Sequence, residues 1–309
     1  MKWFNHFWQQ ALARRGSVLL HVTLHVIGFG AIAAAVCAAS RFVEQQFNTY
    51  LGLDVAPYEI AGGLLGLLLV LRTNAGYDRW WEGRKLWGGI VNQSRNLVIT
   101  ALSYGPADPA WRQQFVRWAS AFSAASRASL RGQRNDPQIA ALVGPEAAAQ
   151  IAAADHAPSF VALQLGAFLQ DAAEKHGMDG FAFLQADRER ALLIDHLGAC
   201  ERILKSPLPL VYSIEIRRFV MLFLVTLPFA LLHKVADIWL IPIITMLVAY
   251  PLTALDQMGI ELQNPFATDN LSHLPLDDIT ATIERNLAGI LAVASQTTVT
   301  ADRSIAVES

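Results

Sequence analysis

Two histidines in an apolar run have the spacing of a metal-binding pair. His21 and His25 stand four residues apart, which places two imidazoles on one face of a helix. Zinc sites need three or four protein ligands, and no third ligand accompanies this pair. Polar side chains inside a span usually hydrogen-bond within the protein. We therefore favour internal hydrogen bonding for both rings, and we expect no metal and no cofactor.

Residue patterns that would support catalysis are absent from the sequence. The chain contains neither the HExxH pattern of a metalloprotease nor the GxSxG pattern of a serine hydrolase. Gly62 and Gly63 lie inside an apolar run, so they do not form a phosphate-binding loop. The two cysteines, Cys37 and Cys200, are too few for a disulfide framework. We expect no catalytic residues and no enzyme activity.

The composition indicates that the elements holding these side chains lie in a lipid bilayer. Hydrophobic residues make up 53% of the chain, charged residues only 16%, and the mean hydropathy is +0.33. A soluble domain carries about 25% charged residues. The net charge of −2 leaves no basic surface for binding phosphates. The lipid bilayer is therefore an expected partner, and nucleic acid is not.

Four apolar segments predict four transmembrane helices. They cover residues 18–40, 56–71, 219–232 and 238–255. The first is longer than the roughly 7–15-residue apolar core of a signal peptide and suits a span of roughly 20 residues. The third is short for a span unless residues 211–216 extend it. This pattern predicts an all-α integral membrane protein.

Basic residues flank the apolar segments on one side of the membrane. Those near the segment ends are Arg14, Arg15, Arg72, Arg79, Arg84, Lys85, Arg202, Lys205, Arg217 and Arg218. The loop between the first two segments instead holds Arg41 against Glu44, Asp54 and Glu59. Because Lys and Arg are enriched on the cytoplasmic side, both termini and the long middle region are predicted to be cytoplasmic.

The middle region, from about residue 99 to residue 208, is too polar to span. Pro and Gly mark breaks at residues 106–109, 132–137, 144–145, 156–158 and 177–180. Between the breaks, apolar residues recur at helical spacing over residues 111–130, 160–176 and 181–205. The alanine-rich run 147–154 also indicates a helix. No alternating pattern predicts a strand.

Four segments of the chain are predicted from these features. Residues 1–98 hold the first two spans and a helical extension of the second, and residues 99–210 form a large helical cytoplasmic region. Residues 211–256 hold the third and fourth spans. Residues 257–309 form a cytoplasmic C-terminal segment, whose polar tail beyond Thr297 is expected to be disordered.

Three separated motifs carry a family resemblance. Residues 71–97 read LRTNAGYDRWWEGRKLWGGIVNQSRNL, with three tryptophans among charges. On physical grounds alone, this pattern is typical of a helix that leaves the bilayer through the headgroup layer. Residues 209–212 read PLVY, and residues 261–283 read ELQNPFATDNLSHLPLDDITATI. In this order and with these spans, most of the chain resembles the bestrophin family, in particular its bacterial branch.

The resemblance implies a homopentamer of four-span subunits around a central pore. The second span would line a narrow apolar neck, and the cytoplasmic helices would enclose a vestibule. Animal members are calcium-activated chloride channels, and bacterial members include cation-preferring ones. We therefore expect a pentameric channel for small monovalent ions in the bacterial inner membrane, with cations preferred. An anion (chloride) channel and a secondary transporter are the alternatives.

The resemblance also places the neck. With residues 79–81 (RWW) as the anchor, the family's neck positions fall on Gly63, Leu67 and Leu71. This i, i+4, i+8 spacing puts them on one helix face, each about 6 Å from the next. Rings of leucine in a fivefold bundle form a constriction that controls permeation by dewetting. Gly63 departs from the family's usual Ile or Phe, so the outermost ring is expected to be wider or absent.

The competing interpretation of Leu67 and Leu71 is that both face lipid or a neighbouring helix.

The resemblance and the sequence also suggest residues at the two ends of the pathway. The family's constriction at the cytoplasmic exit falls on Phe181 or on Leu184. Glu59, at the outer end of the second span, is expected to concentrate cations at the mouth, with a role as an interfacial anchor as the alternative.

The last motif covers the region that forms a calcium site in animal relatives. The matching residues are Glu261, Asn264, Asp269 and Ser272. Calcium takes six to eight oxygen ligands, several of them carboxylates, and the acidic cluster is thinned here. We therefore expect a channel that is not gated by calcium.

Overall fold

Every regular element in the described part of the chain is a helix. The structure, a computed structural model, describes residues 8, 9, 11, 13 and 16–307, with side chains up to Gln296. The chain forms two compact units. The first comprises the chain up to Trp80, Pro207–Pro265 and Asp269–His273; the second comprises Trp81–Ser206, Phe266–Thr268 and the chain from Leu274. The all-α prediction is confirmed.

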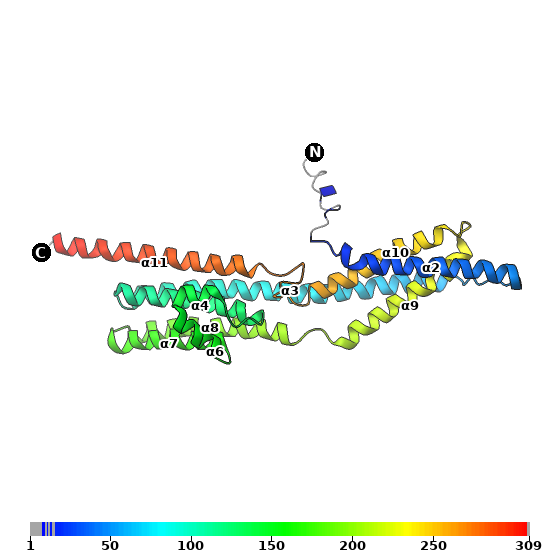
Figure 1. Cartoon of the computed structure of the whole chain (residues 1–309). Coiled ribbons are helices and arrows are strands. Elements are labelled where there is room, and N and C mark those ends of the chain that lie inside the picture. Colours follow the sequence, from blue (N-terminus) through cyan, green and yellow to red (C-terminus); the bar gives the residue numbers. More distant parts are fainter. Residues whose placement is uncertain (1–7, 10, 12, 14–15, 308–309) are drawn as a thin grey trace. The chain divides into compact units, whose positions relative to one another are not determined.

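Among the described residues from Leu19 onward, the first unit contains four helices. They are α2 (Leu19–Phe47), the first part of α3 (Ala56–Tyr104), α9 (Leu210–Lys234) and α10 (Leu240–Glu261). Helix α10 packs against both α2 and α9, and α2 also packs against α9. Helix α3, with 49 residues, is the longest element and continues into the second unit (Figure 1).

In the described part of the chain, three helices are long and apolar enough to cross a membrane. These are α2, α3 and α10, which correspond to the first, second and fourth predicted spans. Helix α9 has 25 residues but is not among them. Its charge-free run is residues 219–232, directly after Arg217 and Arg218. The fourth span therefore stays a prediction.

The second unit holds the remaining helices. They are α4 (Pro109–Leu130), α5 (Pro137–Val143), α6 (Pro145–Ala153), α7 (Ala157–Lys175), α8 (Gly180–Lys205) and α11 (Leu276–Val307), with the end of α3. All five predicted breaks lie between helices. The reason is local: Asp108 accepts hydrogen bonds from the N–H groups of Ala110 and Trp111, and Asp136 and Asp179 cap α5 and α8 in the same way.

Two boundaries differ from those predicted. Helix α3 continues through position 98 to Tyr104, so the boundary expected there falls inside one helix. Helix α11 continues to Val307, so the prediction of a disordered tail beyond Thr297 is wrong for the described residues. The apolar residues of this helix lie mainly in its first part, residues 276–296, and the helix continues from there into the polar tail. Arg14 and Arg15, used above for orientation, lie outside the described residues.

Helix α4 lies at the centre of the second unit. It contacts α5, α7, α8 and α11, and Phe115 and Phe122 are completely buried. The Trp111 and Phe115 rings stack at 5.1 Å, and Phe168 of α7 meets both rings edge-on. Because α4 has neighbours on several sides, it buries polar residues as well as apolar ones, including Arg127.

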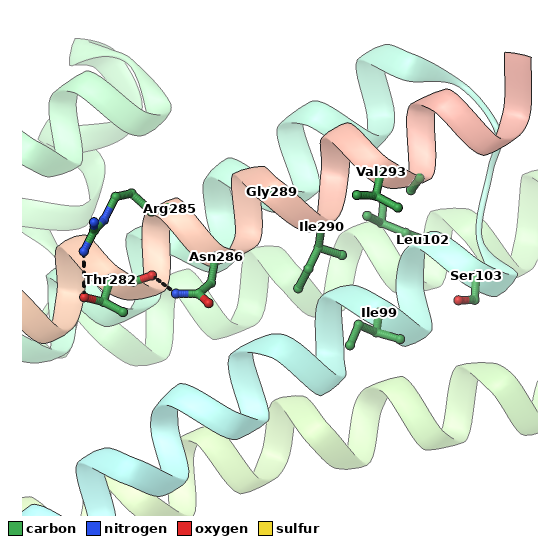
Figure 2. A pocket seen from close by; sticks show the side chains of 10 residues that line it. Ile99, Leu102, Ser103, Thr282, Arg285, Asn286, Gly289, Ile290 and Val293 are labelled. Atoms are coloured by element: carbon green, nitrogen blue, oxygen red, sulfur yellow. Dashed lines mark hydrogen bonds between the residues drawn. The ribbon is translucent and has the colours of Figure 1, made fainter.

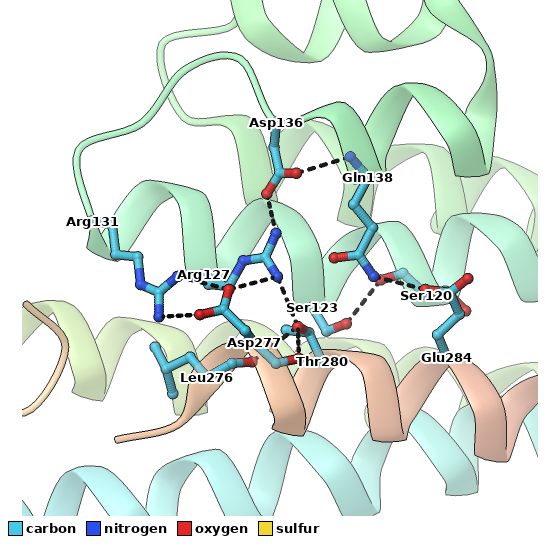
Figure 3. A network of polar contacts seen from close by, with 10 residues as sticks. All are labelled: Ser120, Ser123, Arg127, Arg131, Asp136, Gln138, Leu276, Asp277, Thr280 and Glu284. Carbon is cyan, nitrogen blue, oxygen red and sulfur yellow. Dashed lines mark hydrogen bonds and ion pairs between the residues drawn. The ribbon is translucent and has the colours of Figure 1, made fainter. Parts of the chain in front are cut away.

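A polar network joins α4 to α11 and to the start of α5 (Figure 3). Arg127 pairs with Asp136 and donates to the Thr280 hydroxyl at 3.0 Å. Arg131 donates two hydrogen bonds to the Asp277 carboxylate, at 2.8 and 2.9 Å. Gln138 donates to Glu284 at 2.7 Å. These contacts give partners to the terminal nitrogens of two guanidinium groups that are almost buried, which favours the packing of α11 on α4.

The network lowers the pKa of Asp277. The hydrogen bonds from Arg131 are the main cause, and the charges of Arg131 and Arg127 add to it. Because the folded pKa lies below the unfolded value, the carboxylate stabilises the fold above the ordinary titration range near pH 4. That contribution is lost as the pH falls through the lower folded pKa.

We expect Asp277→Asn to lower the free energy of unfolding by about 1 kcal/mol at pH 7, because it removes the carboxylate that accepts from Arg131. The loss is this small because the Asp277 side chain is largely exposed and its charge is screened. Thermal unfolding of detergent-solubilised protein at pH 7 and pH 3 measures this. The difference from the unsubstituted protein should shrink at pH 3. Asp278→Asn is the matched control, since Asp278 lies in the same helical turn and is exposed; an equal loss in both variants contradicts the network's role.

Candidate ion pathway

One face of α3 in the first unit carries the three predicted neck residues. Leu67 is 56% exposed and Leu71 is 51% exposed, and Gly63 is also exposed. We call Gly63, Leu67 and Leu71 the neck face. Nothing lies within 4 Å of a Cβ placed on Gly63. In the single subunit, therefore, the neck face is largely uncovered by the described residues.

The opposite face of α3 is buried in the core of the first unit. Leu65 is 5% exposed and Leu69 is fully buried. They pack in one cluster with residues of α9 and α10, namely Ile216, Val220, Phe223, Leu224, Leu227, Ala249 and Leu252. Leu67 and Leu69 differ by about 200° around a helix, so burial of Leu69 turns Leu67 away from the core.

A buried ion pair fixes the same rotation at the end of the neck face. Arg72 is 1% exposed, and it pairs with Asp256 of α10. Arg217 of α9 donates to the other oxygen of Asp256 at 3.0 Å. One carboxylate therefore joins three helices.

The pairing of Arg72 with Asp256 is not evident from the sequence. There, Arg72 stands out only as one of the basic residues near the ends of the apolar segments. A signal was present, since each residue directly follows an apolar run and an ionisable residue at such a place needs a partner. The partner itself is 184 residues away, which the sequence alone does not indicate.

The predicted outer-mouth residue is paired. Glu59 accepts from the Lys234 ammonium at 3.3 Å, and both side chains are largely exposed. The negative charge of Glu59 is therefore partly compensated by the end of α9. This contact agrees better with an anchoring role than with an uncompensated ring of carboxylates.

Phe181 and Leu184, the candidates for the cytoplasmic constriction, lie in the second unit at the start of α8. Asp179 caps this helix and accepts from the Phe181 N–H at 2.9 Å. Phe181 is 85% exposed and Leu184 is 64% exposed. Neither side chain belongs to a core of the subunit.

The segment after α10 is held by hydrogen bonds within the first unit. Glu261 is 6% exposed, and its oxygens accept from Gln257 at 2.9 Å and from the Leu271 N–H at 2.7 Å. The Trp80 indole donates to the Ser272 carbonyl at 2.6 Å. The carboxylate that matches the animal calcium site is thus occupied by protein donors.

The remaining residues of that motif add few ligands. Asp269 is exposed, and the Asn264 carbonyl accepts from the Asn270 side chain at 2.8 Å. Among the described residues, no group of three His, Cys, Asp or Glu side chains could hold a metal. His21 and His25 are exposed on α2, so the prediction that their rings hydrogen-bond inside the protein is wrong for the described chain.

A groove of about 830 Å³ lies in the second unit between α3 and α11 (Figure 2). Ile99, Ile290 and Val293 line one part, and Arg285 and Asn286 line the other. The lining does not combine a nucleophile with a base. Cys200, elsewhere in this unit, is no nucleophile either, because burial, helped by the charges of Glu82 and Glu201, raises its pKa to about 12.

Comparisons with known proteins agree with this geometry. The family model described as Bacterial/Fungal Bestrophin protein matches residues 2–289. A voltage-dependent anion channel-forming protein of Nostoc sp. is 31% identical over 286 residues, 91% of each chain. One of Escherichia coli is 33% identical over 77% of this chain and 78% of its own. A solved bacterial Bestrophin homolog from Klebsiella pneumoniae has a TM-score of 0.79 and 27% identity, over 88% of this chain and 98% of that one.

The buried ion pair generates a stability prediction. Asp256→Asn leaves Arg72 as a buried cation without its counter-ion, and we expect a loss of about 3–5 kcal/mol in the free energy of unfolding. Denaturant titration in detergent measures the loss. Replacing both Arg72 and Asp256 by Leu should recover most of it, because an apolar pair removes the unpaired charge.

The control is Glu215→Gln, two residues before Arg217 on α9. Glu215 pairs with Arg218, and both side chains are substantially exposed. Such a pair contributes about 0–1 kcal/mol. A loss for Asp256→Asn no larger than that for Glu215→Gln would show that the Arg72 pair does not anchor α3.

Proposed function

This chain belongs to the bacterial and fungal bestrophin family, and from that premise we propose that five copies assemble into a channel for small monovalent ions. The bestrophin family is a family of membrane ion channels, and relatives along nearly the whole chain are named as channel-forming proteins. The observation in this chain that carries the proposal is the apolar neck face of α3. It is exposed while the opposite face of the same helix is buried.

The proposed pore places the neck face towards a fivefold axis. Leu67 and Leu71 then form two stacked rings about 6 Å apart. An ion in such a ring loses part of its hydration and gains no polar ligand in exchange. Gly63 adds no side chain, so the outermost ring is open. Phe181 and Leu184 remain the candidates for a second constriction, supported by their exposure at the start of α8.

The proposed topology has four spans with both termini cytoplasmic, in a bacterial inner membrane. Helix α9 supplies the span besides α2, α3 and α10. Its 25 residues extend for about 37 Å, more than the roughly 30 Å of a hydrocarbon core. Arg217 and Arg218 then sit at the cytoplasmic end and Lys234 at the outer end, where snorkelling side chains are tolerated.

We take anions as the first candidate for the permeant ion, against the cation preference expected from the sequence. The names of the relatives favour anions, and the pairing of Glu59 with Lys234 weakens the argument from acidic residues at the mouth. Cations are the second candidate. Glu44 and Asp54, both exposed near the outer ends of α2 and α3, favour it.

A secondary transporter is supported less well. Transporters commonly use helices that are broken near mid-membrane, often at Gly or Pro. Pro228 lies inside a continuous α9, and Pro242 lies in the first turn of α10, where proline is compatible with a helix. Neither proline divides its span, so the alternative loses its main candidate features.

Flux through purified protein in liposomes tests the function. A channel carries ions down their gradient without saturating at low concentration, a carrier saturates, and a non-conducting protein carries none. Reversal potentials in asymmetric KCl decide the sign of the permeant ion. Native mass spectrometry should give a pentamer; mainly monomer or dimer argues against the assembly.

Truncation of the neck is the sharpest test of the pore register. Leu71→Ala removes three carbons from each of five subunits at one level, so we expect about a twofold or greater rise in single-channel conductance. Adding Leu67→Ala should raise it further. The ratio of anion to cation permeability should stay unchanged, because no charge is altered. Single-channel recording in planar bilayers measures all three.

Leu69→Ala is the matched control on the same helix. Leu69 is fully buried, so its truncation should cost about 2–5 kcal/mol of stability and leave conductance near that of the unsubstituted channel. If Leu69→Ala raises conductance and Leu71→Ala does not, the assigned face of α3 is wrong.

Opening should not require calcium, because protein donors already occupy both oxygens of Glu261. We expect currents in planar bilayers to be the same in a calcium chelator and in micromolar free calcium. Currents that disappear in the chelator and return with calcium contradict this prediction.

A further inference from the structure

Asp78 continues the neck face of α3 beyond Leu71. It lies seven residues after Leu71, two helical turns and about 10 Å along the axis. Seven residues return nearly to the same side of a helix, so Asp78 shares the orientation of Leu67 and Leu71. Asn74 occupies the turn between them. Asn74 and Asp78 are both exposed, as the leucines of the neck face are.

Asp78 differs from the nearby charges Arg72 and Arg79 in having no partner among the described residues. Arg72 pairs with Asp256, and the Arg79 Nε donates to the Gln263 carbonyl at 3.2 Å. Among the residues that the structure describes, none forms a hydrogen bond or ion pair with Asp78. Its carboxylate is therefore available to whatever passes along this face.

We propose that Asp78 forms a ring of five carboxylates at the inner end of the neck, and that this ring raises the permeability of cations relative to anions. The inference rests on the proposed pentameric channel. The leucine rings carry no charge and cannot distinguish K⁺ from Cl⁻ by sign. Rings of Asp or Glu raise the local concentration of cations and oppose anions, most strongly where low-dielectric walls focus the field.

The position of Asp78 makes it the first charge that an ion meets after the neck. The next charge near the same helical phase is Glu82, eleven residues after Leu71 and about 16 Å from it along the axis, and it pairs with Arg202 at 2.7 Å. With a Debye length of about 8 Å at physiological ionic strength, the nearer carboxylate acts more strongly on an ion leaving the neck. The direction of its effect is fixed whichever ion the intact channel prefers.

Reversal potentials in a KCl gradient test the inference with three substitutions of Asp78. Asp78→Asn should raise the ratio of chloride to potassium permeability by about threefold or more, and Asp78→Lys should raise it further. Asp78→Glu, which keeps the charge, should keep the original ratio. The shift should shrink between 0.05 and 1 M KCl because salt screens it; a change in packing would not show that dependence.

Glu215→Gln is the control for the change in net charge. It removes one negative charge per subunit from α9, away from the neck face, and should leave the permeability ratio unchanged. The inference is overturned if Asp78→Asn and Asp78→Lys conduct with the original ratio, or if Asp78→Glu shifts the ratio as much as Asp78→Asn does. Absence of flux through the unsubstituted protein overturns the proposed function itself.

Discussion

The pairing of Arg72 with Asp256 constrains the first unit more than any other polar contact in it. A guanidinium that is 1% exposed among apolar helices is costly unless a carboxylate accompanies it. Asp256 of α10 supplies that carboxylate and also accepts from Arg217 of α9. The rotation of α3 about its own axis follows, because adjacent residues on a helix differ by 100°. Holding Arg72 inwards leaves Leu71 facing outwards.

The outward face of α3 carries a stripe of exposed apolar residues, and the question is whether this stripe alone specifies an oligomer. Ile60, Leu64, Leu67, Val70 and Leu71 are each at least 46% exposed in the single subunit. In water such a stripe would drive association, but lipid tails are as apolar as leucine and remove most of that driving force. The stripe alone therefore does not specify an oligomer. The proposed pentamer draws on the family for its number of subunits and on α3 for its register.

The fold was largely predictable because its signals are local. Proline in a first turn and an aspartate cap act within three residues, so all five breaks at the helix junctions of the second unit could be located. Apolar runs likewise located α2, α3 and α10. Two predictions were wrong because they depend on long-range packing rather than on local signals. The orientation of His21 and His25 and the end of α11 are both set by the neighbours against which each helix packs.

The candidate site was predictable only in part. The neck positions came from the resemblance, and helical periodicity placed them on one face. The burial of Arg72 could not be predicted, since it depends on a carboxylate 184 residues away. Periodicity also put Asp78 in phase with the neck. Its proposed role became apparent only when Arg72 and Arg79 proved to have partners and Asp78 did not.

Barrier height and charge preference then belong to different residues of the same helix. The neck resists ions of either sign, because shedding hydration in an apolar ring is unfavourable for both. Glu59 at the proposed outer mouth contributes little to the choice, since it is compensated by Lys234 and exposed charges are screened within about 8 Å. An uncompensated carboxylate close to the narrowest point acts where water is scarcest and the field least screened. In the proposed channel, selectivity therefore depends on which charges lack partners, more than on how many charges the pathway contains.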